Sequence, residues 1–156
     1  MTEKEKFIRT DFLNSIDLLG VDTKAAWGKM NAWQMIEHVS SFFKVSSAQI
    51  HFDLAIPEEH LPKYKAFLLS DIPFIENAKA PASVLGEETI PVSSKSFVAA
   101  KELLKRSIDD FFEYFEKNPT ATTLHPAFGE LHREEWILLH HKHVIHHLKQ
   151  FGDQLR

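Results

Sequence analysis

Six of the ten histidines in this 156-residue chain fall between Leu131 and Leu148. They are His132, His140, His141, His143, His146 and His147. An α-helix turns about 100° per residue, so His143 and His147 would share one face with Cβ atoms roughly 5–6 Å apart. Two imidazoles at this spacing can hold one metal ion. Such pairs also arise on helices that bind no metal, so the spacing alone leaves both interpretations open.

A metal held by two histidines of one helix needs a third ligand from another element. His38 is the candidate, because it lies on another expected long helix and borders an apolar stripe beside Met35 and Phe42. Three neutral imidazoles with an open position are typical of a catalytic metal site. Zinc, nickel and iron(II) all accept imidazole nitrogen, so the residue types do not choose among them. The alternative for His38 is a hydrogen-bonded core histidine.

Two further histidines of the cluster, His140 and His146, are the candidates for acid–base catalysis beside the metal. His140 could also be a ligand or a buried polar group, and we favour a partner that orients a ligand. Glu37 is adjacent to a proposed ligand but would point about 100° away from it on a helix. His125 lies in a Pro/Gly turn, where it could fix the loop by a hydrogen bond or contact substrate at the mouth of the site.

The composition describes one globular domain, residues 1–156, and excludes several classes of function. Apolar residues make up 44% and charged residues 26% of the chain, which is typical of a folded domain. The net charge of -4 gives no basic surface for nucleic acid. With no cysteine, any metal must be held by nitrogen and oxygen. No stretch has the roughly 18–20 apolar residues of a membrane span or an apolar leader, so we expect a cytoplasmic protein with no membrane partner.

The spacing of apolar residues predicts four long helices and one short helix that position these histidines. They are expected from about Glu3 to Leu19, from Asn31 to about Ile50, from Pro57 to about Leu68 (the short one), from Ser94 or Ser96 to about Lys117, and from Glu134 to Phe151. A long loop over 70–96 and a connection over 120–131 complete the chain, and no strand-like alternation competes. The predicted fold is all-α, a four-helix bundle with an extra short helix and a long loop.

The order of these signals resembles the DinB-like (YfiT-like) superfamily of metal-dependent hydrolases and transferases, four-helix bundles with three metal-binding histidines. The segment Trp27-Gly-Lys-Met-Asn-Ala-Trp-Gln-Met-Ile-Glu-His38 is similar to the family's first histidine region, and His143-Val-Ile-His-His147 to its later His-x-x-x-His. Residues 125–131, 134–136 and 139–152 resemble one uncharacterised bacterial branch of that superfamily. Many relatives have Arg-Gly-Gln after the last histidine, where this chain has Leu148-Lys-Gln150, and His132 stands where a capping Ser or Thr is expected.

The resemblance implies nickel or zinc binding, a homodimer and, in some members, thiol-dependent transfer in which a small thiol is activated at the metal, and the ligand types also admit iron. We therefore expect a metal-dependent hydrolase or thiol-dependent transferase in which His38, His143 and His147 bind a divalent metal and a small-molecule substrate. Because the chain lacks cysteine, any thiol must be exogenous. The alternative is a non-catalytic, stress-associated bundle protein that binds a metal or a small ligand. A third hypothesis is a structural dimer in which the histidines ignore added metal.

Overall fold

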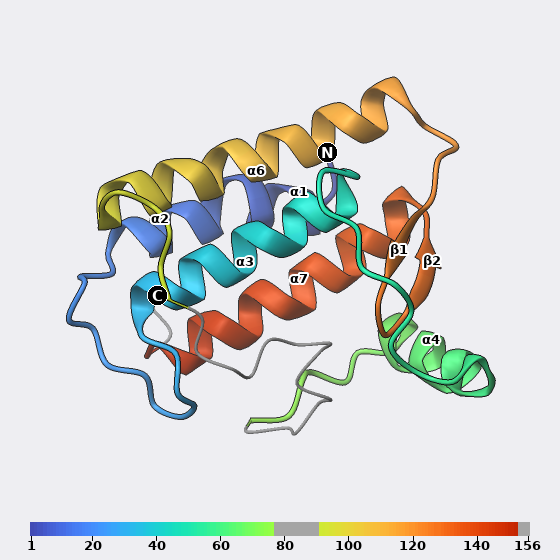
Figure 1. Cartoon of the computed structure of the whole chain (residues 1–156), viewed down its shortest axis with the longest axis horizontal. Helices are drawn as coiled ribbons and strands as arrows, with labels where there is room; N and C mark the ends of the chain where they lie inside the picture. Colours follow the sequence, from blue (N-terminus) through green and yellow to red (C-terminus); the bar gives the residue numbers. More distant parts are fainter. Residues whose placement is uncertain (77–90, 153–156) are drawn as a thin grey trace.

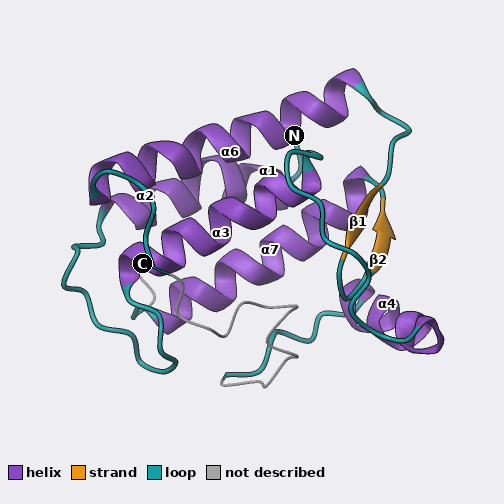
Figure 2. Cartoon of the chain, viewed as in Figure 1, coloured by secondary structure: helices purple, strands orange, loops and turns teal. Residues whose placement is uncertain are grey.

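The computed structural model describes residues 1–76 and 91–152, in which helices surround one hydrophobic core and a short hairpin lies at one end (Figure 1). Helices account for most of this part of the chain (Figure 2). The elements are α1 (Glu3–Lys6), the π-helical η1 (Phe7–Asp11), α2 (Phe12–Asp17), α3 (Ala32–Ser46), the 3₁₀ turn η2 (Glu58–His60), α4 (Leu61–Leu69), α6 (Phe97–Lys117), β1 (Thr123–His125), β2 (Gly129–Leu131) and α7 (Arg133–Gln150).

The three longest helices, α3, α6 and α7, each begin at a side chain that accepts a hydrogen bond from the first turn. Asn31 and Gln34 form the expected reciprocal cap at the start of α3, and such caps satisfy backbone N–H groups that the helix leaves free. Ser96 caps α6, which decides between the two serines considered. His132 caps α7 by accepting from the Glu135 N–H at 3.3 Å. A histidine thus occupies the place where serine or threonine was expected.

Helix α3 ends four residues before the expected Ile50 because a cluster of hydroxyl groups ends it. Ser46 and Ser47 both donate to the carbonyl of Phe43, at 2.9 and 3.0 Å. These bonds compete with continued helix. Ala48 then adopts a left-handed φ of 64°, which turns the chain away from the helix axis.

The connection expected over 120–131 is a β-hairpin, so the predicted all-α four-helix bundle is wrong. Strands β1 and β2 pair antiparallel, with Thr123 opposite Leu131 and His125 opposite Gly129. Each strand is three residues long, too short for a period of two to stand out in sequence. The hydroxyl of Thr123 donates to the Ser46 carbonyl at 2.9 Å and ties the hairpin to the end of α3.

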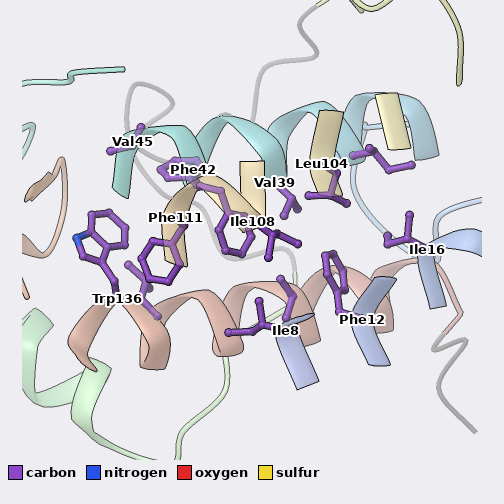
Figure 3. Close-up of a cluster of buried hydrophobic side chains, with 14 of the residues drawn as sticks. Ile8, Phe12, Ile16, Val39, Phe42, Val45, Leu104, Ile108, Phe111 and Trp136 are labelled. Atoms are coloured by element: carbon purple, nitrogen blue, oxygen red, sulfur yellow. The ribbon is translucent and has the colours of Figure 1, made fainter. Parts of the chain in front are cut away.

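Large apolar side chains from the N-terminal helical segment, α3, α6 and α7 interdigitate in the core (Figure 3). Fully buried members include Phe12, Phe43, Phe111, Phe115 and Trp136. Helices α3 and α7 lie side by side across this core (Figure 1). The same packing that buries the aromatic rings therefore brings the face of α3 that carries His38 against the histidines of α7. No helix in the described ranges is long and apolar enough to cross a membrane.

Candidate metal centre

The structure brings the three predicted ligands together from two helices that are distant in sequence. His38 extends from α3 and its Nε2 atom lies 3.0 Å from Nε2 of His143 on α7. Nε2 of His147, one turn further along α7, also lies 3.0 Å from Nε2 of His143. The three candidate ligand atoms all lie within 4.8 Å of one another. The three rings pack against one another in T-shaped contacts at interplanar angles of 70–76°.

Burial keeps these imidazoles neutral, which is the form that binds a metal. His143 and His147 are buried, and His38 keeps some exposed surface. Burial, with a smaller contribution from the nearby His146, lowers the pKa of His38 to about 4. Burial also holds the pKa values of His143 and His147 well below 6.5. At neutral pH all three can present a nitrogen lone pair.

Gln150 determines which nitrogen of His147 carries the proton. The amide Nε2 of Gln150 donates to the Trp27 carbonyl at 3.1 Å, so its Oε1 must face His147. Oε1 lies 2.7 Å from Nδ1 of His147. Since a carbonyl oxygen only accepts, Nδ1 of His147 is the donor. In the neutral ring its Nε2 is then a lone pair directed at the other two imidazoles.

The turn at Trp27 and Gly28 holds Gln150 in place on the side away from His147. The Ala26 N–H donates to the Gln150 backbone carbonyl at 2.7 Å. A Cβ at Gly28 would lie 2.7 Å from the Gln150 side-chain nitrogen, and Gly28 has a φ of +83°. Both features favour glycine, because other residues rarely adopt this φ and their Cβ would collide. The connection between α2 and α3 therefore orients a histidine of α7.

The donor set fits a divalent metal. Nitrogens bound to a common zinc at about 2.0–2.1 Å lie roughly 3–3.4 Å apart for inter-ligand angles between the octahedral and tetrahedral values. Two of the three separations, from Nε2 of His143 to Nε2 of His38 and of His147, are both 3.0 Å and match the lower end of that range. All three ligands are imidazole nitrogens, which suit zinc and nickel, and iron(II) as well. A hydrogen-bonded partner such as Gln150 is the usual companion of a metal-binding histidine.

Aromatic side chains enclose the side of the cluster near His143. The rings of Phe42 and Phe74 lie 5.4 and 6.4 Å from the His143 ring, centroid to centroid. Phe74 belongs to the beginning of the expected 70–96 loop, and Lys142 fixes that part by donating to the carbonyls of Ser70 and Ile72. Residues 70–76, the first part of this loop, therefore lie beside the candidate site. Residues 77–90 lie outside the described part of the chain.

The two histidines predicted to act in acid–base catalysis occupy different environments. His140 is buried, stacked on Phe43 at 3.8 Å between ring centroids, and within 2.9 Å of the Ser46 hydroxyl. His146 is half-buried, and its ring lies 5.2 Å from that of His147. Burial lowers the pKa of both. His146 is the better placed of the two to exchange protons with solvent, and the catalytic role of each stays a prediction.

His125 fixes the hairpin turn by hydrogen bonds, which is the first of the two interpretations given from the sequence. Its Nδ1 accepts from the N–H groups of Ala127 and Phe128 at 2.9 and 3.3 Å. Burial lowers the pKa of His125 to about 3. The neutral ring therefore carries its proton on Nε2. The other interpretation is also open, because His125 lines a pocket next to His143.

A family model described as a protein of unknown function (DUF1569) matches residues 77–154, half of the chain. The chain belongs to the DUF1569 family. The matched part of this family member includes the hairpin and α7, with His143 and His147, and does not include His38. Comparisons with curated proteins and with solved structures give no match.

This assignment corrects the resemblance to the DinB-like superfamily, which is a different family from the one that matches. The motifs that suggested it are short. A His-x-x-x-His pair follows from helix geometry wherever two imidazoles share a face, so it does not separate one helical family from another. The expectations that came from that superfamily alone, the homodimer and the thiol substrate, have no support from the DUF1569 match.

Sequence reasoning missed Gln150, Gly28 and the Trp27 carbonyl as parts of the site. Gln150 stands three residues after His147, a spacing at which helical side chains meet, and this signal was available. Gly28 and Trp27 gave no comparable signal, because their contacts with Gln150 join residues more than 120 positions apart.

Proposed function

We propose that this DUF1569 protein is a metal-dependent hydrolase acting on a small-molecule substrate. The observation that supports the proposal is the convergence of one ring nitrogen each from His38, His143 and His147, all within 4.8 Å of one another. Three neutral imidazoles leave further positions for water and substrate, which is typical of catalytic rather than structural sites. A divalent metal there would act as a Lewis acid and acidify a water molecule.

The remaining residues of the site support this chemistry through positioning and proton transfer. Gln150 holds the His147 ring in one tautomer. Phe42 and Phe74 restrict solvent on one side of His143, and a low local dielectric strengthens electrostatic interactions with substrate. His146, half-exposed beside His147, would transfer protons between the site and solvent.

The alternative is a non-catalytic metal-binding protein, and the size of the adjoining pocket favours it. That pocket has about 10 Å³ of space for solvent, enough for about one water molecule. A substrate larger than this must bind mainly outside the pocket. A metal that binds tightly but supports no turnover would identify the alternative.

Elemental analysis of untagged protein tests the proposal first. We expect one equivalent of a divalent metal per chain, lost in His143→Ala and retained in the control His60→Ala, whose imidazole is exposed and away from the cluster. Circular dichroism checks that both variants keep their helices. Wild-type metal content in His143→Ala would refute the site.

Activity then separates the two functions. Protein loaded in turn with zinc, nickel and iron(II) is assayed with chromogenic esters and phosphoesters. Turnover that disappears in His143→Ala supports a hydrolase. Stoichiometric metal without turnover of any of these substrates supports the binding protein. The elemental analysis of the untagged protein as purified identifies which of the three metals the cell supplies.

A further inference from the structure

A small pocket beside His143 is bordered on its solvent side by one aromatic ring. Six of its wall residues belong to α3, α7 and β1, and each is at most 9% exposed. They are Phe42, His125, Trp136, Leu139, His140 and His143. The seventh, Phe74, is only partly buried and belongs to no helix or strand. Phe74 therefore forms the side of the wall that faces solvent.

Contacts with helices α4 and α7 hold the Phe74 ring in this position. The centroid of the ring lies 5.4 Å from that of Phe67 on α4. On α7 it lies 5.8 Å from the ring of His146 and 6.4 Å from that of His143. The Phe74 ring therefore bridges the two helices across the outer side of the pocket.

The segment that carries Phe74 is attached to the rest of the protein largely through its backbone. Lys142 donates to the carbonyls of Ser70 and Ile72, whereas the side chains of Ile72 and Ile75 are 57% and 71% exposed. A change of side chain at position 74 leaves the Lys142 hydrogen bonds in place. We therefore expect such a change to alter the pocket without releasing the segment.

The Phe74 ring limits the space available beside His143. The pocket has about 10 Å³ of space, which is enough for about one water molecule or a group of similar size. Phe74→Ala would vacate the volume of one benzene ring next to this space. The side chains of Phe42 and Leu139 would line the enlarged site, so it would favour an apolar occupant over a charged one.

We propose that Phe74 determines specificity, because it limits the size of the apolar group that a substrate can place beside His143. In an apolar pocket, one methylene group changes discrimination between substrates by about 10–200-fold. The inference rests on the proposed function only in calling the ligand a substrate. The size limit itself is a property of the pocket, so it can be measured without any reaction.

The first test measures the size limit by the binding of benzene. Benzene is titrated into the protein in the presence of zinc, which is diamagnetic, so the spectrum can be recorded whether or not the metal binds. The methyl signals of Leu139, assigned by their loss in Leu139→Met, are followed in a ¹H–¹³C spectrum. We expect saturable shifts in Phe74→Ala, with a Kd on the order of 1–10 mM for so small a ligand, and none in wild type. The matched control is Ile75→Ala, which shortens an exposed side chain of the same segment outside the pocket wall and should behave as wild type.

The second test asks whether a substrate uses this space. Zinc-loaded protein is assayed with p-nitrophenyl acetate and p-nitrophenyl butyrate. We expect the ratio of kcat/KM for butyrate to that for acetate to rise at least about 10-fold in Phe74→Ala and to stay unchanged in Ile75→Ala. Phe74→Leu, which keeps an apolar side chain next to Phe67, should give an intermediate ratio and provides the size test if the alanine variant does not fold.

The failure of this inference can be told apart from the failure of the proposed function. A Phe74→Ala protein that keeps its helices by circular dichroism but does not bind benzene would overturn the size limit, and so would equal binding by wild type. If esters are hydrolysed with the same preference in all variants, the hydrolase stands and the role of Phe74 in specificity is refuted. If benzene binds only to Phe74→Ala and no ester is hydrolysed, the size limit stands and the hydrolase proposal fails.

Discussion

Replacing Gln150 by leucine tests whether the orientation of His147 controls metal affinity. Gln150 is 3% exposed, so water cannot easily replace its oxygen as the partner of the His147 Nδ1–H, now 2.7 Å away. The leucine would leave that buried N–H unpaired, or let the proton move to Nε2 and block the lone pair directed at the metal. Losing such a partner of a metal-binding histidine lowers metal affinity about 10–100-fold, which corresponds to roughly 1.4–2.7 kcal/mol.

The matched control is Gln150→Glu. A carboxylate still accepts from Nδ1–H of His147, but it cannot donate to the Trp27 carbonyl as the amide does. We therefore expect Gln150→Glu to bind metal more tightly than Gln150→Leu. Zinc affinity is measured by competition with a chromogenic chelator, and long-range ¹H–¹⁵N spectra report the tautomer of His147. Affinity of Gln150→Leu within twofold of wild type, with an unchanged tautomer, would refute the reasoning.

Three further predictions concern the support of the site and the stability of the fold. Gly28→Ala places a Cβ 2.7 Å from the Gln150 amide nitrogen at a φ of +83°, so it should weaken zinc binding in the same chelator assay while leaving the ligands intact; unchanged affinity would contradict this. Burial lowers the pKa of His125 to about 3 in the native state, so only the unfolded state takes up this proton as pH falls below 6.5. This residue should therefore lower the free energy of unfolding by about 1.4 kcal/mol for each unit by which the pH is reduced. In urea titrations, His125→Asn should show a dependence of unfolding free energy on pH that is smaller by that amount. Hydrogen bonds from the backbone N–H of Thr2 and from Arg133 lower the pKa of Glu5 to about 2, against the opposing effect of burial. Glu5→Gln should therefore lower the free energy of unfolding by about 1–2 kcal/mol at pH 7. In urea titrations, this difference from wild type should vanish as pH falls from 4.5 toward 2.

The helices could be located from the sequence because their signals are local. Apolar spacing places a helix at each of the five expected positions, and the cap at Asn31 and Gln34 fixes the start of α3 in the structure as it does in the sequence. The errors lie at short elements. The hairpin over Thr123–Leu131 was missed because strands of three residues carry no recognisable period. The end of α3 was missed because hydroxyl groups, not a glycine or proline, end it.

The candidate site likewise has a part that the sequence predicts and a part that only the structure shows. The pairing of His143 and His147 follows from their spacing on one helix. The choice of His38 as the third histidine needed an assumption that two helices face each other, and the structure brings its Nε2 to 3.0 Å from that of His143. Gln150 was visible only as a residue near the last histidine, and its hydrogen bond showed which role it has.

What the sequence determined by itself is what depends on residues within one or two helical turns: the helices, their caps, the histidine pair on one face, and the absence of thiol ligands. Only the tertiary structure decided the contacts between distant segments. The approach of His38 to α7 and the contact of Gly28 with Gln150 both depend on how whole helices pack. Packing is set by the summed burial of many apolar side chains, and no local pattern encodes which distant residues that burial brings together.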